Sequence, residues 1–230
     1  MNFLCFEDKN NKSILFIYGM ASTAMLCYEP ILKRLSDYYV ILAEVDGHSG
    51  RTGELVSLEK DCNEIEDYIM DNLSGNLYCL SGFSMGATMV AEIIGRGNVN
   101  VVKAHLDAAF VTKMGLLTKP FEYVFCKAIK WIQNGKVIPK FMMDAVMDKD
   151  NNSIIEIVYS NNIPENIRSY KGTVLFWRGS NEQYTRKSVA LLKKYLPAII
   201  DVEIEYMGHG QYLHEHSDEY AGKLIEYLQS

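Results

Sequence analysis

One stretch of the chain reads LYCLSGFSMGA, from Leu77 to Ala87. Its first four residues form a short apolar run that predicts a strand, and a helix is predicted from Ala87 to Ile94. Between them lies Gly-Phe-Ser-Met-Gly, with Ser84 at its centre. A serine held at such a strand-to-helix turn has a strained backbone that pushes its hydroxyl out of the fold. The stretch therefore predicts a nucleophilic serine at one edge of a sheet.

The neighbours of Ser84 suit this role. Gly82 and Gly86 carry no Cβ, so the strand and helix backbones can pass close together. Met85 begins the helix, and its free N–H and the positive end of the helix dipole then lie beside the serine hydroxyl. We expect this N–H to be one of two donors that stabilise negative charge on an attacked carbonyl oxygen.

Apolar runs alternate with amphipathic segments on both sides of this turn. The apolar runs predict further strands at residues 2–6, 13–18, 39–45, 100–106, 172–177 and 202–206. Helical spacing predicts one helix after Thr23 and others at residues 57–73, 184–196 and 218–228. Strands that alternate with helices predict an α/β fold with a doubly wound, mostly parallel sheet.

This alternation stops between residues 110 and 170. The segment carries many methionine and aromatic residues in two stretches of helical character. We expect a helical lid, inserted into one domain formed by residues 1–109 and 171–230, over the edge of the sheet where ligands bind in such folds. Methionine side chains adapt to varied apolar ligands, which favours an apolar acyl or aryl group as the substrate, and the compact lid favours one of small to medium size.

The composition excludes several other classes of protein. The net charge of −6 disfavours nucleic acid as a partner, and no apolar run is long enough for a membrane helix. The first eight residues lack a secretory signal, and five scattered cysteines are expected to be reduced, so we expect a cytoplasmic protein. His214 and His216 make a poor metal pair on a helix, and phosphate or dinucleotide motifs are missing from the sequence, so no metal or other cofactor is expected.

A serine hydroxyl needs a base, and the base needs a partner that fixes its tautomer. His209 is the best candidate base, because it lies in Met-Gly-His-Gly directly after the last predicted strand. Two acidic residues compete for the third role. Glu182 follows the strand that ends at Trp177, and Asp107 follows the strand before the predicted lid.

Ser84 in its strand-turn-helix, a later acid and His209, in this order, resemble the α/β-hydrolase family over nearly the whole chain. The resemblance implies that the acid lies in the loop of Glu182, although Asp is more common there, and Asp107 remains the alternative. It also implies that the second oxyanion donor is a backbone N–H after the strand at residues 13–18. We assign Met20 by position, with Ala21 as a near alternative, although this chain has Tyr18 where many relatives have His.

The resemblance implies a function as well as a fold. We expect a serine hydrolase that cleaves an ester or thioester of a small-molecule acyl substrate through an acyl-enzyme on Ser84. The alternative is a member of the same fold that binds a small ligand and reacts once or not at all, since a fold alone does not guarantee turnover. The oligomeric state stays open.

Overall fold

The computed structural model describes residues 1–20, 22–46, 56–111 and 165–230. They form one seven-stranded sheet in the order β1-β3-β2-β4-β5-β6-β7. The strands are β1 (Asn2–Phe6), β2 (Ser13–Ile17), β3 (Tyr39–Glu44), β4 (Asn76–Phe83), β5 (Asn100–Asp107), β6 (Thr173–Gly179) and β7 (Ile200–Ile204). Only β1 is antiparallel to its neighbour. The predicted α/β fold with a mostly parallel sheet is therefore confirmed.

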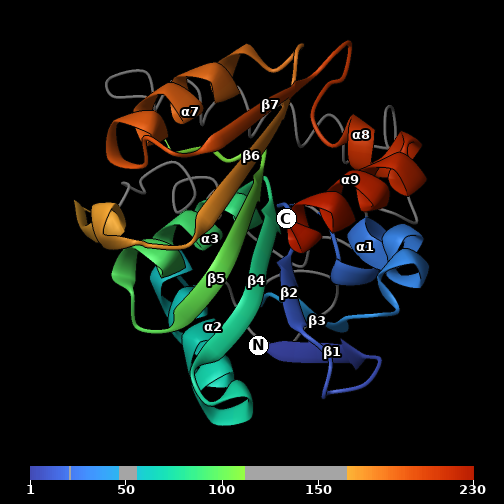
Figure 1. Cartoon of the computed structure of the whole chain (residues 1–230), viewed down its shortest axis with the longest axis vertical. Helices are drawn as coiled ribbons and strands as arrows, with labels where there is room; N and C mark the ends of the chain where they lie inside the picture. Colours follow the sequence, from blue (N-terminus) through green and yellow to red (C-terminus); the bar gives the residue numbers. More distant parts are fainter. Residues whose placement is uncertain (21, 47–55, 112–164) are drawn as a thin grey trace.

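Helices cover both faces of this sheet (Figure 1). One face carries α1 (Ala24–Leu32), α8 (Gln211–Glu215) and α9 (Ser217–Gln229), and the other carries α2 (Leu58–Leu73), α3 (Met85–Arg96) and α7 (Gln183–Tyr195). Two short 3-10 helices, η1 (Lys33–Leu35) and η4 (Glu165–Ser169), complete the described elements. Thr23 and Ser57 cap α1 and α2, because their side-chain oxygens accept hydrogen bonds from free N–H groups in the first turn.

The core lies along the central strands. Residues 14–17 of β2 are apolar and fully buried, as expected for a parallel strand that is covered on both faces. The outer strands β1 and β7 have a mixed pattern of exposure instead. The well-packed centre supports the carboxyl ends of β4, β6 and β7, from which the candidate site is built.

Most of the predicted lid, residues 112–164, lies outside the described residues, so the boundary between lid and core stays a prediction. In the part of the chain that the structure describes, no helix is long and apolar enough to cross a membrane.

Candidate active site

Ser84 stands in a strained turn between β4 and α3. Its φ of 54° and ψ of −115° lie outside the regions that residues other than glycine ordinarily adopt. Two backbone hydrogen bonds hold the turn: Ser84 N–H donates to the carbonyl of Asp107 at 2.8 Å, and Thr88 N–H donates to the carbonyl of Ser84 at 3.1 Å. The neighbouring strand β5 and the first turn of α3 thus fix the position of the serine.

The turn is closely packed against its surroundings. A Cβ on Gly82 would overlap the backbone of Gly86, and a Cβ on Gly86 would overlap the carbonyl of Ile17 in β2. These overlaps explain why the motif carries glycine at both positions.

His209 lies in the loop between β7 and α8, next to the serine. Its Nε2 is 2.9 Å from Ser84 Oγ, although the two residues are 125 positions apart. The ring of Phe83 packs against the imidazole with 4.8 Å between ring centroids. Gly210 follows with a φ of 71°, and a Cβ there would lie 2.8 Å from Phe83. The tight loop therefore brings the imidazole onto the serine hydroxyl.

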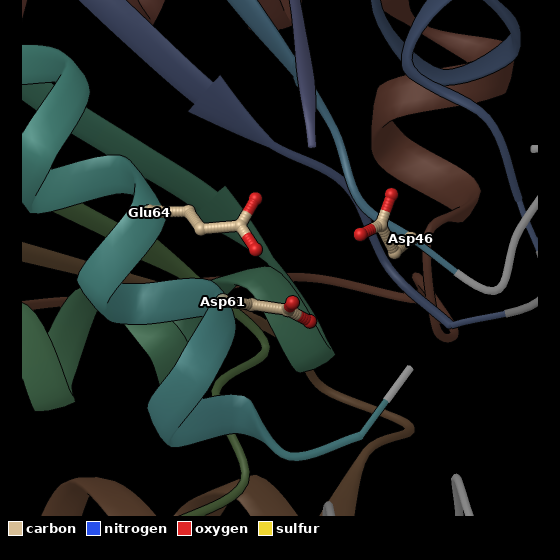
Figure 2. Close-up of side chains that lie close together, drawn as sticks. All are labelled: Asp46, Asp61 and Glu64. Carbon is tan, nitrogen blue, oxygen red and sulfur yellow. The ribbon is translucent and has the colours of Figure 1, made fainter. Parts of the chain in front are cut away.

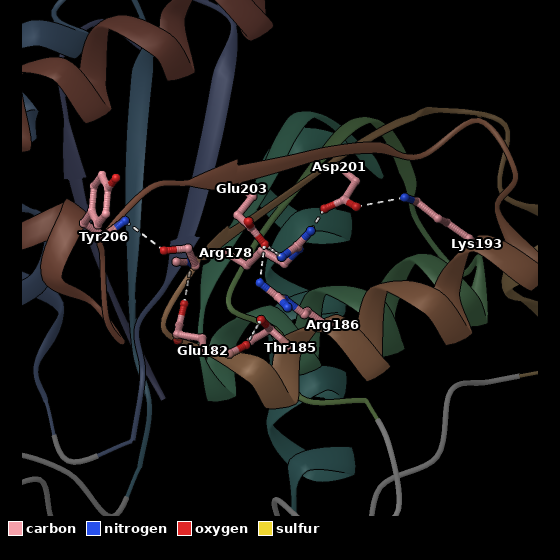
Figure 3. Close-up of polar contacts among 10 residues, drawn as sticks. Arg178, Glu182, Thr185, Arg186, Lys193, Asp201, Glu203 and Tyr206 are labelled. Atoms are coloured by element: carbon pink, nitrogen blue, oxygen red, sulfur yellow. Dashed lines mark hydrogen bonds and ion pairs between the residues drawn. The ribbon is translucent and has the colours of Figure 1, made fainter.

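Glu182 lies between β6 and α7 and holds the other side of the imidazole. Its Oε1 accepts a hydrogen bond from His209 Nδ1 at 2.6 Å, and its Oε2 accepts one from Gly179 N–H at 2.7 Å. Figure 3 shows the second of these contacts beside the ion pairs that link β6, β7 and α7. Only 3% of Glu182 is exposed. A buried carboxylate with both oxygens satisfied can hold the Nδ1 proton of His209, which leaves Nε2 free to accept from Ser84.

The surroundings keep Glu182 ionised. Burial opposes the charged form, but the hydrogen bond and charge of His209 and the donors Gly179 and Tyr184 outweigh it. The pKa of Glu182 is therefore lowered from its ordinary value.

Tyr184 is a residue of the site that was not predicted from the sequence. Its hydroxyl donates to Glu182 Oε1 at 2.8 Å and also lies 2.8 Å from His209 Nδ1. The residue sits at the start of α7, two positions after Glu182. A hydroxyl-bearing residue so close to the candidate acid is the only signal in the sequence that could have indicated it.

Asp107 occupies a different place. It ends β5, and its buried side chain lies beside the Tyr220 hydroxyl. Among the described residues, no ion pair joins it to His209. Burial, followed by the negative charge of Glu182, raises the pKa of Asp107 to about 8. The structure thus brings Ser84, Glu182 and His209 together without Asp107, whose raised pKa favours a protonated carboxyl group at neutral pH.

The loop after β2 lies directly against the serine. A Cβ on Gly19 would be 3.1 Å from the Cβ of Ser84, so the backbone next to Met20 runs beside the candidate nucleophile. Tyr18 is buried, and its hydroxyl donates to the carbonyl of Val45 at 3.2 Å. Met85 begins α3 as expected. Ala21 lies outside the described residues, and the oxyanion roles of Met20 and Met85 stay predictions.

The arrangement can carry out nucleophilic chemistry at a carbonyl group. A hydroxyl, an imidazole and a buried carboxylate form an unbroken chain of hydrogen bonds at the carboxyl ends of three parallel strands. This edge is where ligands bind in open α/β sheets.

No family model matches the sequence, and no curated protein is similar to it in sequence. Solved structures do match it in shape. An α/β-hydrolase family protein from Desulfitobacterium hafniense aligns with a TM-score of 0.83 and 17% identity, covering 99% of this chain and 100% of that one. A carboxylesterase of Nitrososphaera gargenis aligns with a TM-score of 0.79 and 15% identity, covering 99% of this chain and 93% of that one. An enol-lactonase from Burkholderia xenovorans LB400 aligns with a TM-score of 0.74 and 14% identity, covering 100% of this chain and 96% of that one. The chain therefore has the fold of the α/β-hydrolase family.

Proposed function

We propose that this protein is a serine hydrolase that cleaves an ester or thioester of a small to medium apolar acyl or aryl substrate. The observation that carries the proposal is the pair of contacts at His209, with Ser84 Oγ at 2.9 Å and Glu182 Oε1 at 2.6 Å. The carboxylesterase and the enol-lactonase among its structural neighbours support chemistry at a carbonyl group, and at these identities they do not indicate a substrate.

The first half of the reaction forms an acyl-enzyme. His209 Nε2 takes the proton of the Ser84 hydroxyl while Oγ attacks the substrate carbonyl carbon. The N–H groups of Met20 and Met85 donate hydrogen bonds that stabilise the negative charge developing on the carbonyl oxygen. Glu182 stabilises the imidazolium ion that forms. The carbon–oxygen or carbon–sulfur bond then breaks, and His209 gives its proton to the leaving alcohol or thiol.

The second half regenerates the enzyme. Water replaces the leaving group and attacks the acyl carbon, with His209 Nε2 accepting one of its protons. The ester bond to Ser84 breaks, and the proton on His209 returns to Oγ. The products are a carboxylic acid and the alcohol or thiol released earlier.

The direct test is covalent labelling with a fluorophosphonate, followed by intact mass measurement. We expect the wild-type protein to gain the mass of one phosphonyl group, and Ser84→Ala to gain none. Ser36→Ala, at an exposed serine after η1, is the matched control and should label like the wild type. An unlabelled wild-type protein would contradict the proposal.

A second measurement separates turnover from ligand binding. Nitrophenyl esters of graded chain length are incubated in molar excess over the protein. A hydrolase releases many equivalents of nitrophenol per chain, whereas a single-turnover receptor stops after one. Activity that peaks on the short or medium acyl chains would support the proposed substrate size, and activity that peaks on the longest chains would oppose it.

A further inference from the structure

Three carboxylates gather at a second place in the molecule, between the end of β3 and the start of α2. Asp46 follows β3, and Asp61 and Glu64 project from the first two turns of α2 (Figure 2). One oxygen atom from each lies within 4.8 Å of those of the other two. This acidic cluster is separate from the residues of the proposed reaction.

Two ammonium groups already contact the cluster. The α-amino group of Met1 is 2.6 Å from Glu64 Oε2 and 3.4 Å from Asp46 Oδ2. Lys60 Nζ is 3.0 Å from Glu64 Oε1 and 3.6 Å from Asp46 Oδ2. Both cations therefore pair with the same two carboxylates, and neither forms an ion pair with the third.

Asp61 is the member that these cations do not reach. Its side chain is fully buried, with 0% of the residue exposed, and it points toward the space beside Asp46 and Glu64 (Figure 2). Among the residues that the structure describes, neither of its carboxyl oxygens has a hydrogen-bond partner. A buried carboxylate without a partner is costly, so a cation at this place would stabilise its ionised form.

We propose that Asp46, Asp61 and Glu64 bind a hard divalent cation, and specifically Ca²⁺. Carboxylate oxygens are the ligands that Ca²⁺ prefers, at about 2.3–2.6 Å, so oxygens on opposite sides of the ion lie about 4.6–5.2 Å apart. Because the three oxygens lie within 4.8 Å of one another, a single Ca²⁺ can contact all three. Mg²⁺ binds at about 2.0–2.1 Å in near-ideal octahedral geometry and requires a tighter arrangement. Water completes the coordination, and the ion supplies the positive charge that Asp61 lacks.

The competing explanation is a cluster of ion pairs that only fastens the amino end of the chain to α2. The two explanations differ in what Lys60 does. If a metal ion shares Asp46 and Glu64 with the ammonium groups, removing the Lys60 charge strengthens metal binding. If the cluster only forms ion pairs, the same change weakens the fold and no metal binds.

The test is calorimetric titration of the metal-stripped full chain with CaCl₂, and separately with MgCl₂, at constant ionic strength. We expect one Ca²⁺ per chain with a Kd at or below about 1 mM, and weaker binding of Mg²⁺. Thermal unfolding should shift upward with added Ca²⁺, because an ion that binds the folded state stabilises it. These measurements do not depend on any enzymatic activity.

Three variants decide whether the cluster is the site. Asp61→Asn keeps the shape and removes the charge, and should weaken Ca²⁺ binding by about tenfold or more. Asp67→Asn, at an exposed position of the same helix, is the matched control and should bind like the wild type. Lys60→Gln should bind more tightly. Circular dichroism shows which variants are folded, and Glu64→Gln replaces Asp61→Asn if that variant is not.

Two results would overturn the proposal. One is a wild-type chain that shows neither heat of binding nor a thermal shift at about 10 mM CaCl₂, a concentration above the range of weak protein sites. The other is equal Ca²⁺ affinity in the cluster variant and in Asp67→Asn, which would place the ion elsewhere.

Discussion

At the scale of single residues, the pKa values of the two candidate acids are shifted in opposite directions, each for a physical reason. Glu182 accepts hydrogen bonds on both oxygens, and its pKa is lowered although burial works against ionisation. Asp107 is buried beside a tyrosine hydroxyl, and burial raises its pKa to about 8. A residue that stabilises an imidazolium ion must be ionised during turnover, so this difference favours Glu182.

Amide substitution at each acid tests this assignment. Glu182→Gln keeps the size of the side chain but loses the charge that stabilises protonated His209, so kcat should fall by about 10²–10⁴-fold while KM changes little. Asp107→Asn is the matched comparison and should keep kcat within about tenfold of the wild type. Steady-state kinetics on one nitrophenyl ester gives both values. An Asp107→Asn variant that loses as much turnover as Glu182→Gln would reverse the assignment.

Tyr184 should have a smaller effect through Glu182. Tyr184→Phe removes the hydroxyl that donates to Glu182 Oε1 and lies beside His209 Nδ1. Loss of one such hydrogen bond costs about 0.5–1.5 kcal/mol, so kcat should fall by about two- to tenfold with KM unchanged. Labelling with the fluorophosphonate gives the concentration of active protein by which kcat is calculated, because a loss of folded protein would also lower the apparent kcat at unchanged KM. An unaltered kcat would show that the hydroxyl has no part in positioning the acid.

At the scale of elements, the turn between β4 and α3 depends on close backbone contact. Gly86→Ala would drive a methyl group into the carbonyl of Ile17, which is backbone in the centre of the sheet and cannot move aside. Overpacking of this kind costs about 1–3 kcal/mol, so chemical denaturation should show a clear loss of stability.

Gly222→Ala is the control for that substitution. Gly222 lies within α9, and a Cβ there would meet nothing within 4 Å. Alanine is favoured over glycine inside a helix by about 0.5–1 kcal/mol, so this variant should be more stable than the wild type. A gain of stability in both variants would mean that a methyl group at position 86 fits beside Ile17 and that the contact with β2 carries no cost.

The elements that the sequence predicts well are those with a strong local pattern. Continuous apolar runs identified β2 to within one residue and β4 with an end three residues too early, and the helical spacing from Leu58 to Leu73 identified α2. The helix α8 was missed because its five residues are too short to show a period. Its Tyr212 and Leu213 are buried by packing that only the fold creates.

The same limit applies to the sites. Ser84, Glu182 and His209 could each be chosen because each follows a predicted strand, but their contacts depend on the order of the strands in the sheet. The acidic cluster of Asp46, Asp61 and Glu64 has no motif, because its members meet only when α2 packs beside the end of β3. A local pattern can identify a nucleophile in a tight turn, whereas a cluster of carboxylates from two separate elements can be identified only from the tertiary structure.

At the scale of the whole molecule, the buried acid Asp107 couples the stability of the fold to pH. Its pKa is raised to about 8 in the folded state by burial and by Glu182, whereas an exposed Asp in the unfolded chain titrates near about 4. Between these values the folded protein keeps a proton that the unfolded chain releases. Rising pH therefore favours unfolding across this window, and the contribution of the protonated Asp107 is lost by about pH 8.

Asp107→Asn should remove this pH dependence, because an amide stays neutral in both states. The free energy of unfolding of the wild type relative to Asp107→Asn should fall from pH 5 to pH 8 by up to about 1.4 kcal/mol per pH unit and then level off. Urea denaturation of both proteins at intervals of pH gives this difference, in which the contributions of all other titrating groups cancel. A difference that rises with pH would mean that the folded state holds Asp107 as a carboxylate, which would contradict its raised pKa.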